Sequence, residues 1–267
     1  MSPRDVVLAA RAAGLDVLGL TDHDTAEGWE AAREAAEEVG LGLVPGMEIS
    51  CEHAGRSVHL LAYYPDPGHR PLQEALRLVL EGRDARTPRV CARLRELGID
   101  IDEREVARRA GGAVAIGRPH IADTLVDLGV VAHRDEAFDR FLSPGRPAYV
   151  RRYAAPLEQM LRTVQDAGGV PVIAHPWGRH EPAALQAEGL AGLQEHGLAG
   201  IEVDHQDHDA DQRRILRGIA GELGLLVTGS SDFHGAGKRD HDLGCNTTAP
   251  EVLAEIRRRM QPVASTG

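Results

Sequence analysis

Short apolar runs alternate with amphipathic segments along most of this chain. The apolar runs have the length of buried strands, and we expect them at residues 16–20, 41–44, 57–63, 170–174, 200–203 and 225–229. Apolar positions with a helical period predict helices over residues 26–39, 157–167, 183–195, 210–223 and 251–260. One more helix is expected at the amino end, where Ser2 can cap it and Pro3 fits its first turn. This alternation is typical of a parallel α/β fold.

The pattern changes between about residue 71 and residue 142, where it is helical and rich in Arg and Glu, with no good strand. Asp102 followed by Glu105 predicts a capping box, and Pro119 predicts a helix start at Arg118. We interpret this stretch as a helical insertion of four or five short helices. The chain then divides into an N-terminal part of the main fold (1–66), the insertion or arm (67–150) and a C-terminal part (151–267).

Composition narrows the functional classes. The 267 residues include 30 Lys+Arg against 41 Asp+Glu, a net charge of −11, which disfavours bulk binding to a nucleic-acid backbone. No apolar run approaches the roughly 18 residues that a membrane-spanning helix needs. The amino end is an amphipathic helix with internal charges and not a signal peptide. Three widely spaced cysteines predict free thiols in a reducing cytoplasm: Cys51, Cys91 and Cys245.

This acidic chain has 13 histidines, and several of them fall where expected strands end: His23, His175, His205 and His234. The carboxyl ends of parallel strands emerge on one face of a sheet or barrel, so we expect the side chains there to converge. A lone histidine at a strand end is commonly a hydrogen-bonded core residue, but imidazoles and carboxylates together are ligands for Zn²⁺, Mn²⁺ or Fe²⁺. The joint pattern favours metal ligation by His23, Glu48, His59, His175, Asp232 and His234.

Seven short motifs occur in order along the chain, and together they carry a family resemblance. They are TDHDT at 21–25, GMEIS at 46–50, HLLAY at 59–63, GRPH at 117–120, IAHP at 173–176, GIEV at 200–203 and GSSDFHG at 229–235. The chain resembles the polymerase-and-histidinol-phosphatase (PHP) metallophosphoesterases, and its arm resembles that of the nucleoside 3′,5′-bisphosphate phosphatase-like branch. The resemblance implies a distorted seven-stranded β/α barrel with a helical insertion.

One departure from the family concerns the amino end. The family begins with a strand that ends in an HxH motif and is followed by an Asp, whereas this chain starts at the next helix. The resemblance therefore implies one complete metal set, Glu48, His59 and His175. Two further sets are implied in part: Glu48 and Asp232 without two histidines, and His23 and His234 without the Asp. Either the start codon is misplaced or the chain truncated, or this is a genuine short form with weakened metal binding.

The resemblance implies a mechanism with two to three divalent transition metal ions, Mn, Fe or Zn, and a metal-bridging hydroxide that attacks phosphorus. Glu48, Asp232 and His234 are the expected catalytic residues. Because an arginine fork can bind two phosphate oxygens, Arg118 with His120 is the first candidate for substrate binding, followed by His208 and Arg179. Gly235 to Lys238 lacks the spacing of a phosphate-binding loop and predicts a turn.

The expected substrate is a small phosphorylated metabolite or nucleotide, such as the 3′-phosphate of a nucleoside 3′,5′-bisphosphate. No bulk nucleic acid or membrane partner is expected. Two alternatives remain at this point: a catalytically impaired scaffold that binds metal or nucleotide, and an exonuclease that acts on short oligonucleotides.

Overall fold

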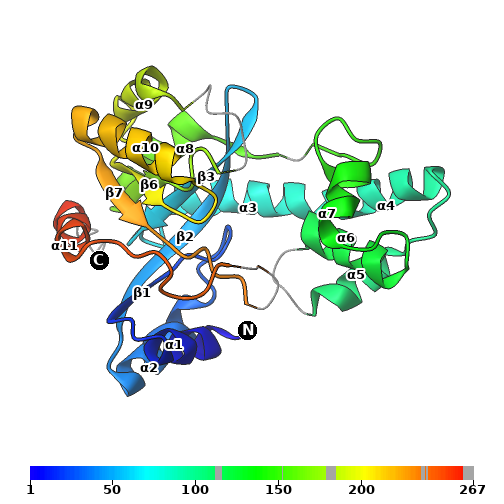
Figure 1. Ribbon diagram of the computed structural model, residues 1–267, viewed down its shortest axis with the longest axis horizontal. Helices are drawn as coiled ribbons and strands as arrows, with labels where there is room; N and C mark the ends of the chain where they lie inside the picture. The colour runs from blue at the N-terminus through cyan, green and yellow to red at the C-terminus, as the bar shows by residue number, and fades with distance from the viewer. Residues whose placement is uncertain (112–115, 152, 179–184, 236–237, 239, 261–267) are drawn as a thin grey trace. The chain divides into compact units, whose positions relative to one another are not determined.

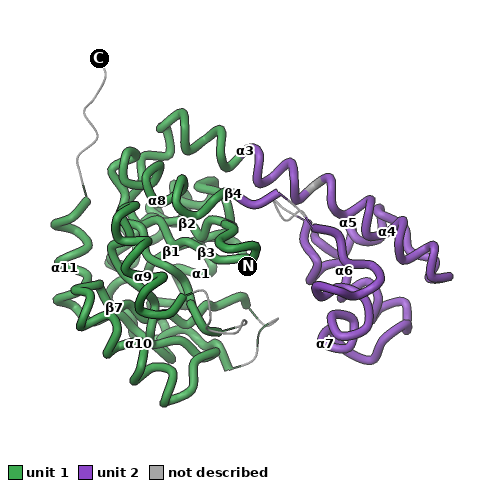
Figure 2. Tube along the Cα trace, turned by 90° about the horizontal axis from the view of Figure 1, so that it is seen from above, with its two compact units in different colours: residues 1–76, 155–267 green, residues 77–154 purple. Residues whose placement is uncertain are grey.

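The computed structural model describes residues 1–267 except 112–115, 152, 179–184, 236–237, 239 and 261–267. Two compact units make up the chain (Figure 2). The first unit contains Met1–Leu76 and Ala155–Gly267, and the second contains Arg77–Ala154. A single helix, α3 (Arg70–Asp84), continues across the boundary between them.

The first unit is built around a seven-stranded mixed sheet that curls into a half-barrel, the distorted α/β barrel expected from the sequence (Figure 1). Its strands run in the order β1-β2-β3-β5-β6-β7, with the short β4 paired to β2. The strands are β1 (Val17–Leu20), β2 (Gly42–His53), β3 (Arg56–Tyr63), β4 (Ala155–Pro156), β5 (Val170–Ile173), β6 (Gly200–Asp204) and β7 (Leu226–Gly229). All six strands expected from the sequence are present.

The strand directions correct one expectation. The alternation predicted a parallel α/β architecture, but β3 is antiparallel to both of its neighbours, β2 and β5. The reason is a tight hairpin: β2 continues to His53, and Ala54 and Gly55 reverse the chain with φ angles of 48° and 76°. Two successive residues with positive φ match the right-handed twist of a hairpin. Glu48, expected after a strand, therefore lies inside one.

Helices cover the sheet of the first unit (Figure 1). They are α1 (Pro3–Ala12), α2 (Trp29–Val39), α8 (Leu157–Asp166), α9 (Ala187–Gln194), α10 (Ala210–Leu223) and α11 (Pro250–Arg259). Helix α1 begins as predicted, with Ser2 and Asp5 forming a reciprocal capping box. Two clusters of buried side chains join helices to sheet: α1 and α2 bury alanines and Val7 against β1, and α11 buries Ile256 with residues of β2, β3, β5 and β7.

The second unit is helical in the residues described, as the arm was predicted to be. It contains α4 (Arg86–Glu96), α5 (Glu103–Ala110), α6 (Arg118–Asp127), α7 (Arg134–Ala137) and a π-helical turn at Phe138–Leu142. The predicted capping box of Asp102 and Glu105 starts α5. This unit has a hydrophobic core of its own, in which Leu94, Ile101, Ile121 and Leu125 are fully buried.

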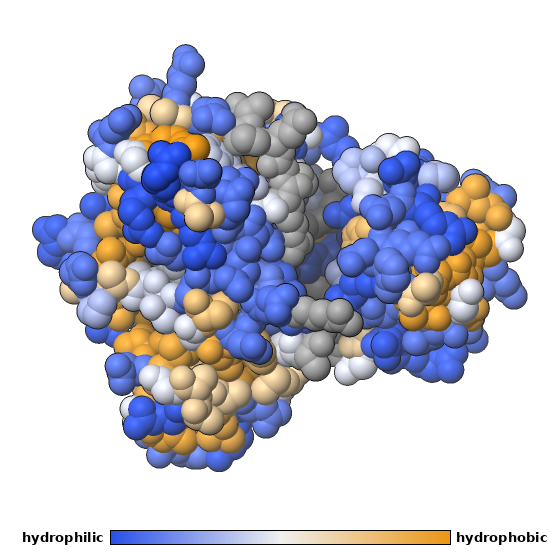
Figure 3. All heavy atoms as spheres, viewed as in Figure 1, coloured by the Kyte–Doolittle hydropathy of each residue, from blue (hydrophilic) through white to orange (hydrophobic). Residues whose placement is uncertain are grey.

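The surface drawn in Figure 3 is largely hydrophilic, with apolar residues in separate patches. Exposed large apolar side chains, such as Leu8 and Ile215, are scattered over different helices. Isolated exposed apolar residues of this kind are usual on a protein surface. Among the described residues, no helix combines the length and the apolar character needed to cross a membrane.

Candidate metal centre

The segment that follows β1 is held beside β2 by its backbone. Glu48 donates its N–H to Asp22 and accepts the N–H of Asp24, at 3.1 Å each, which places His23 next to Glu48. The buried carboxylate of Asp24 accepts hydrogen bonds from the Ser50 N–H at 2.7 Å and the Ser50 hydroxyl at 3.0 Å. Asp24 has a φ of 57°, a conformation that Asp tolerates better than most residues. Asp24 thus fixes the loop that carries His23.

Glu48 is the centre of the first group of side chains. Its Oε1 lies 2.6 Å from Nδ1 of His59 and 3.2 Å from Nε2 of His175, while its Oε2 lies 3.6 Å from Nδ1 of His23. The hairpin explains the pairing with His59, because the register sets Ser50 opposite His59 and Glu48 opposite Leu61 on the same face. His175 is brought alongside by the hydrogen bond from Ala174 N–H to the His59 carbonyl.

This geometry fits a divalent metal. Ligand atoms of His23, Glu48 and His59 all lie within 4.8 Å of one another. Nδ1 of His59 is buried and faces Oε1 of Glu48, 2.6 Å away. Imidazole nitrogen and carboxylate oxygen are the ligands that Zn²⁺, Mn²⁺ and Fe²⁺ accept.

The protonation states also suit a metal. Burial lowers the pKa of His59 to about 4, so its imidazole is neutral near pH 7. Burial would raise the pKa of Glu48, but His23, His59 and His175 together hold it well below its usual range. Neutral imidazole beside an ionised carboxylate is the state that a metal ion requires of its ligands.

His175 adopts a strained backbone conformation at the end of β5. Its φ of 27° lies in the left-handed region, which side chains other than glycine rarely occupy. Its N–H donates to Oε2 of Glu202 at 3.0 Å, and Glu202 comes from the neighbouring β6 and is 1% exposed. Burial raises the pKa of Glu202. Glu202 belongs to the GIEV motif, and the sequence alone gave no role for it, although a carboxylate inside an apolar strand signals one.

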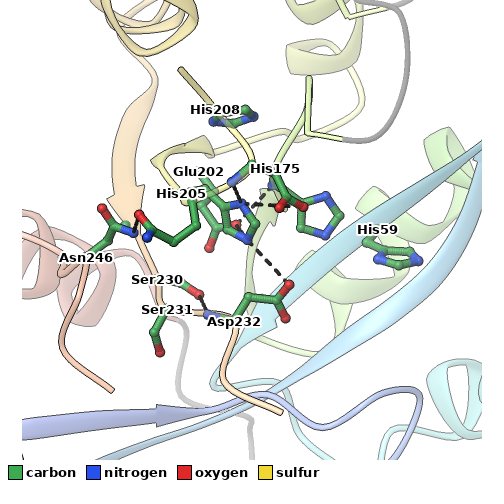
Figure 4. Close-up of polar contacts among 12 residues, drawn as sticks. His59, His175, Glu202, His205, His208, Ser230, Ser231, Asp232 and Asn246 are labelled. Carbon is green, nitrogen blue, oxygen red and sulfur yellow. Dashed lines mark hydrogen bonds and ion pairs between the residues drawn. The ribbon is translucent and has the colours of Figure 1, made fainter. Parts of the chain in front are cut away.

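A second group of side chains surrounds Asp232, just after β7 (Figure 4). Its Oδ2 accepts a hydrogen bond from Lys238 and lies 3.4 Å from Nε2 of His205, and its Oδ1 lies 3.2 Å from Nδ1 of His234. Burial would raise the pKa of Asp232, but the contacts with His205 and His234 and the charge of Lys238 hold it far below its usual range. Asp232 is therefore a fully ionised carboxylate.

Ligand atoms of His205, Asp232 and His241 lie within 4.8 Å of one another, but the tautomer of His205 argues against its binding a metal. Its Nδ1 accepts the Asp207 N–H at 3.0 Å, so in the neutral ring the proton is on Nε2, the atom that faces Asp232. A nitrogen that carries a proton cannot be a ligand. The completely buried His205 instead orients the carboxylate of Asp232. The sequence alone left His205 open between lining the pocket and a structural role.

Imidazole rings connect the two groups. His234 donates from Nδ1 to the carbonyl of Asp232 at 2.9 Å, and its ring centroid is 6.1 Å from that of His23. His23 and His59 are 5.1 Å apart by the same measure, His59 and His175 are 5.2 Å apart, and His175 and His205 are 5.1 Å apart. The six side chains predicted as ligands thus lie in one continuous cluster.

Three of the four candidates for substrate binding are described in this structure, and each has partners within the chain. His208 is buried, donates from Nδ1 to the Val203 carbonyl at 2.9 Å and accepts the Trp177 N–H at Nε2, so both ring nitrogens are engaged. Arg179 lies outside the described residues. In the second unit, the guanidinium of Arg118 lies 5.5 Å from the ring centroid of Phe138 and 5.7 Å from that of Tyr149. It also donates a hydrogen bond to the carbonyl of Leu142. Nδ1 of His120 accepts the Gly117 N–H at the start of α6, and burial lowers the His120 pKa.

Comparison with known proteins identifies the family. No family model matches the chain. A 3′,5′-nucleoside bisphosphate phosphatase from Chromobacterium violaceum is 32% identical over 262 residues, which cover 98% of this chain and 92% of the relative. A 5′-3′ exoribonuclease from Haemophilus influenzae is 32% identical over 234 residues, 88% of this chain and 85% of the relative.

Solved structures agree. One from Bifidobacterium adolescentis, described as a metal-dependent phosphoesterase, has a TM-score of 0.90 and 37% identity, covering 98% of this chain and 92% of that one. The chain belongs to the PHP family of metal-dependent phosphoesterases. A two-domain structure from Bacteroides vulgatus with a PHP-like phosphoesterase shares the fold at a TM-score of 0.51 and 17% identity, covering 97% of this chain and 57% of that one. As a member of the PHP family the chain is a hydrolase of phosphate esters, and divalent metals are its cofactors.

Proposed function

We propose that this PHP phosphoesterase removes the 3′-phosphate from a nucleoside 3′,5′-bisphosphate or a closely similar small phosphomonoester. The observation that carries the proposal is the cluster around Glu48, in which three imidazoles face one buried carboxylate at 2.6 to 3.6 Å. The nearly full-length similarity to a bisphosphate phosphatase supports the choice of substrate. The scattered apolar surface supports a small polar substrate over a lipid surface.

The residues that would hold the metals divide between the two oxygens of Glu48. Oε1 faces His59 and His175, and Oε2 faces His23, so this carboxylate can serve two neighbouring ions. Asp232 and His234 would complete the arrangement on the side of His23. When bound, divalent metals polarise the phosphoryl oxygens and make a nucleophile available from water at neutral pH.

The protein itself supplies rigidity and charge control around these ligands. Glu48 and His59 are in paired strands, where backbone hydrogen bonds fix their positions. Glu202 fixes the backbone of His175, and His205 fixes the carboxylate of Asp232. Ligands held in this way need little rearrangement when the ions and the substrate bind, which favours catalysis by positioning and by fixed charge.

The proposal can be tested by steady-state hydrolysis of adenosine 3′,5′-bisphosphate with release of phosphate as the readout. We expect activity with added Mn²⁺ that is lost on chelation and falls by several orders of magnitude in Glu48→Gln and His59→Ala. A Glu158→Gln variant is the matched control, because Glu158 contacts His53 away from the cluster. Binding of metal and nucleotide without hydrolysis would instead support the impaired-scaffold alternative, and activity retained in both variants would refute the proposed site.

An exonuclease acting on short RNA is the second candidate, and one observation favours it. Charge is unevenly distributed: residues 77–154 contain 15 arginines and 12 acidic residues, a net charge of +3, although the whole chain carries −11. The arm alone is therefore compatible with a polyanion, which the overall charge did not suggest. A 5′-labelled tetranucleotide assayed beside the bisphosphate distinguishes the candidates through the ratio of their kcat/KM values.

A further inference from the structure

The structure pairs the carboxylate of Asp232 with an internal cation. The Asp232 side chain is 10% exposed, and Lys238 donates a hydrogen bond directly to its Oδ2. The other neighbours are imidazoles: His205 lies 3.4 Å from the same Oδ2, and His234 lies 3.2 Å from Oδ1. A carboxylate so deeply buried is costly without a positive partner. Lys238 supplies that charge in this structure.

Lys238 is chemically distinct in this protein, because it is the only lysine among 30 Lys+Arg. A lysine ammonium is a compact point charge on a flexible four-carbon stem, whereas an arginine presents a rigid planar fork. The Lys238 side chain is 19% exposed, so part of it contacts solvent and it can swing away from Asp232 without leaving the surface. Its type and its position therefore suit a cation that exchanges between partners.

We propose that Lys238 neutralises Asp232 in the metal-free chain, leaves Oδ2 when a divalent metal binds, and then contributes its ammonium to binding of the substrate phosphate. The last step rests on the function proposed above. The first two steps follow from competition, because one carboxylate oxygen with an ammonium hydrogen-bonded to it is not available to a metal, and a metal in its place repels the ammonium.

The role in phosphate binding follows from where Lys238 would go. Lys238 follows Asp232 by only six residues and contacts it in this structure, so a released ammonium would remain within reach of the cluster. A phosphomonoester is a dianion near neutral pH, and lysine binds phosphate as a point charge. The same side chain would thus serve as counter-ion first to the protein and then to the substrate.

Amine labelling tests the exchange directly, because Lys238 provides the only ε-amine of the chain. The metal-free protein is treated with a limiting amount of an acetylating N-hydroxysuccinimide ester, with a free lysine peptide as internal reference. Modification of Lys238 is then measured by peptide mass spectrometry. We expect labelling to accelerate several-fold on addition of Mn²⁺ and to slow again when inorganic phosphate is added with the metal. Labelling that Mn²⁺ leaves unchanged or slows would overturn the proposal.

Two substitutions separate competition from a merely structural role. Lys238→Gln removes the charge and should bind Mn²⁺ several-fold more tightly by isothermal titration calorimetry, with a raised KM for the phosphate ester. Lys238→Arg keeps the charge and should bind Mn²⁺ about as the unaltered chain does. Weaker metal binding by Lys238→Gln would overturn the proposal. Labelling and calorimetry need no turnover, so failure of the proposed substrate would leave both results intact.

Discussion

Substitution of Glu202 tests whether its hydrogen bond to the His175 N–H positions His175 for metal binding. Replacing Glu202 with leucine keeps a buried side chain of similar bulk but removes the acceptor, 3.0 Å away, of the His175 N–H. We expect the variant to bind Mn²⁺ about tenfold to a hundredfold more weakly, the usual cost of removing a residue that orients a metal ligand. The cause is movement of His175, which reaches its position only through a strained φ of 27°.

The expected loss of Mn²⁺ affinity follows from the hydrogen bond between the His175 N–H and Glu202. A buried N–H without an acceptor costs about 1–3 kcal/mol, and a residue held in the left-handed region stores a similar amount. Once Glu202 is gone, both penalties are relieved if the turn relaxes and carries the His175 ring away from Glu48. A hundredfold loss of affinity corresponds to about 2.7 kcal/mol, which lies within that range.

The assay is calorimetric titration of the metal-free protein with Mn²⁺, accompanied by thermal unfolding without metal. Leucine also removes a buried carboxyl whose raised pKa shows that burial opposes its charge, so we expect the metal-free melting temperature to change little. Glu202→Gln is the matched control, because its amide oxygen can still accept the His175 N–H and should preserve affinity within a few-fold. Unchanged Mn²⁺ affinity in Glu202→Leu would refute this reasoning.

Three further predictions follow from the site and the cysteines. Contacts with carboxylates outweigh burial at His175 and raise its pKa, and the hydrogen bond to Asp232 does so at His234. A metal must displace these protons, so the affinity for Mn²⁺ should rise with pH. The calorimetric heat of Mn²⁺ binding should also vary with the ionisation enthalpy of the buffer, and a heat that does not depend on the buffer would contradict this prediction. Saturation at 100 times Kd adds about 2.7 kcal/mol of stability, so chelation should lower Tm by about 5–10 °C in a melting scan. Ellman's reagent should react quickly only with the exposed Cys245, because Cys51 and Cys91 are buried. Burial also raises the pKa of Cys91 to about 11. A second fast-reacting thiol would contradict the burial of these two cysteines.

The periodicity of the sequence was sufficient to predict the secondary structure that carries the site. The predicted helix over residues 210–223 matches α10, and each expected strand was found, although β2 continues nine residues beyond its expected end at Val44. These elements are amphipathic or wholly buried, so local pattern and tertiary burial agree. The β2–β3 hairpin was missed because the expected strand ended at Val44, and only the pairing with β3 shows that β2 continues through residues 46–53.

The candidate ligands were predictable from residue type, but the residues that support them were not. His23 and His175 stood out as imidazoles next to strand ends. The role of His205 depends on which ring nitrogen carries the proton, and that follows from the Asp207 N–H, a contact formed only in the folded chain. Lys238 was read as part of a turn because no sequence pattern relates a lysine to a carboxylate six residues earlier.

The arm interrupts the sheet in sequence, and this affects the order in which the chain can fold. Tyr63 of β3 pairs with Val170 of β5, so the sheet cannot be completed until the whole arm has left the ribosome. The arm has its own hydrophobic core and local helix contacts, which favour rapid folding. During synthesis the edge of β3 remains unpaired while the arm folds, because its partner β5 follows the arm in the sequence. A partly synthesised chain should therefore expose the edge of β3 as a site for aggregation.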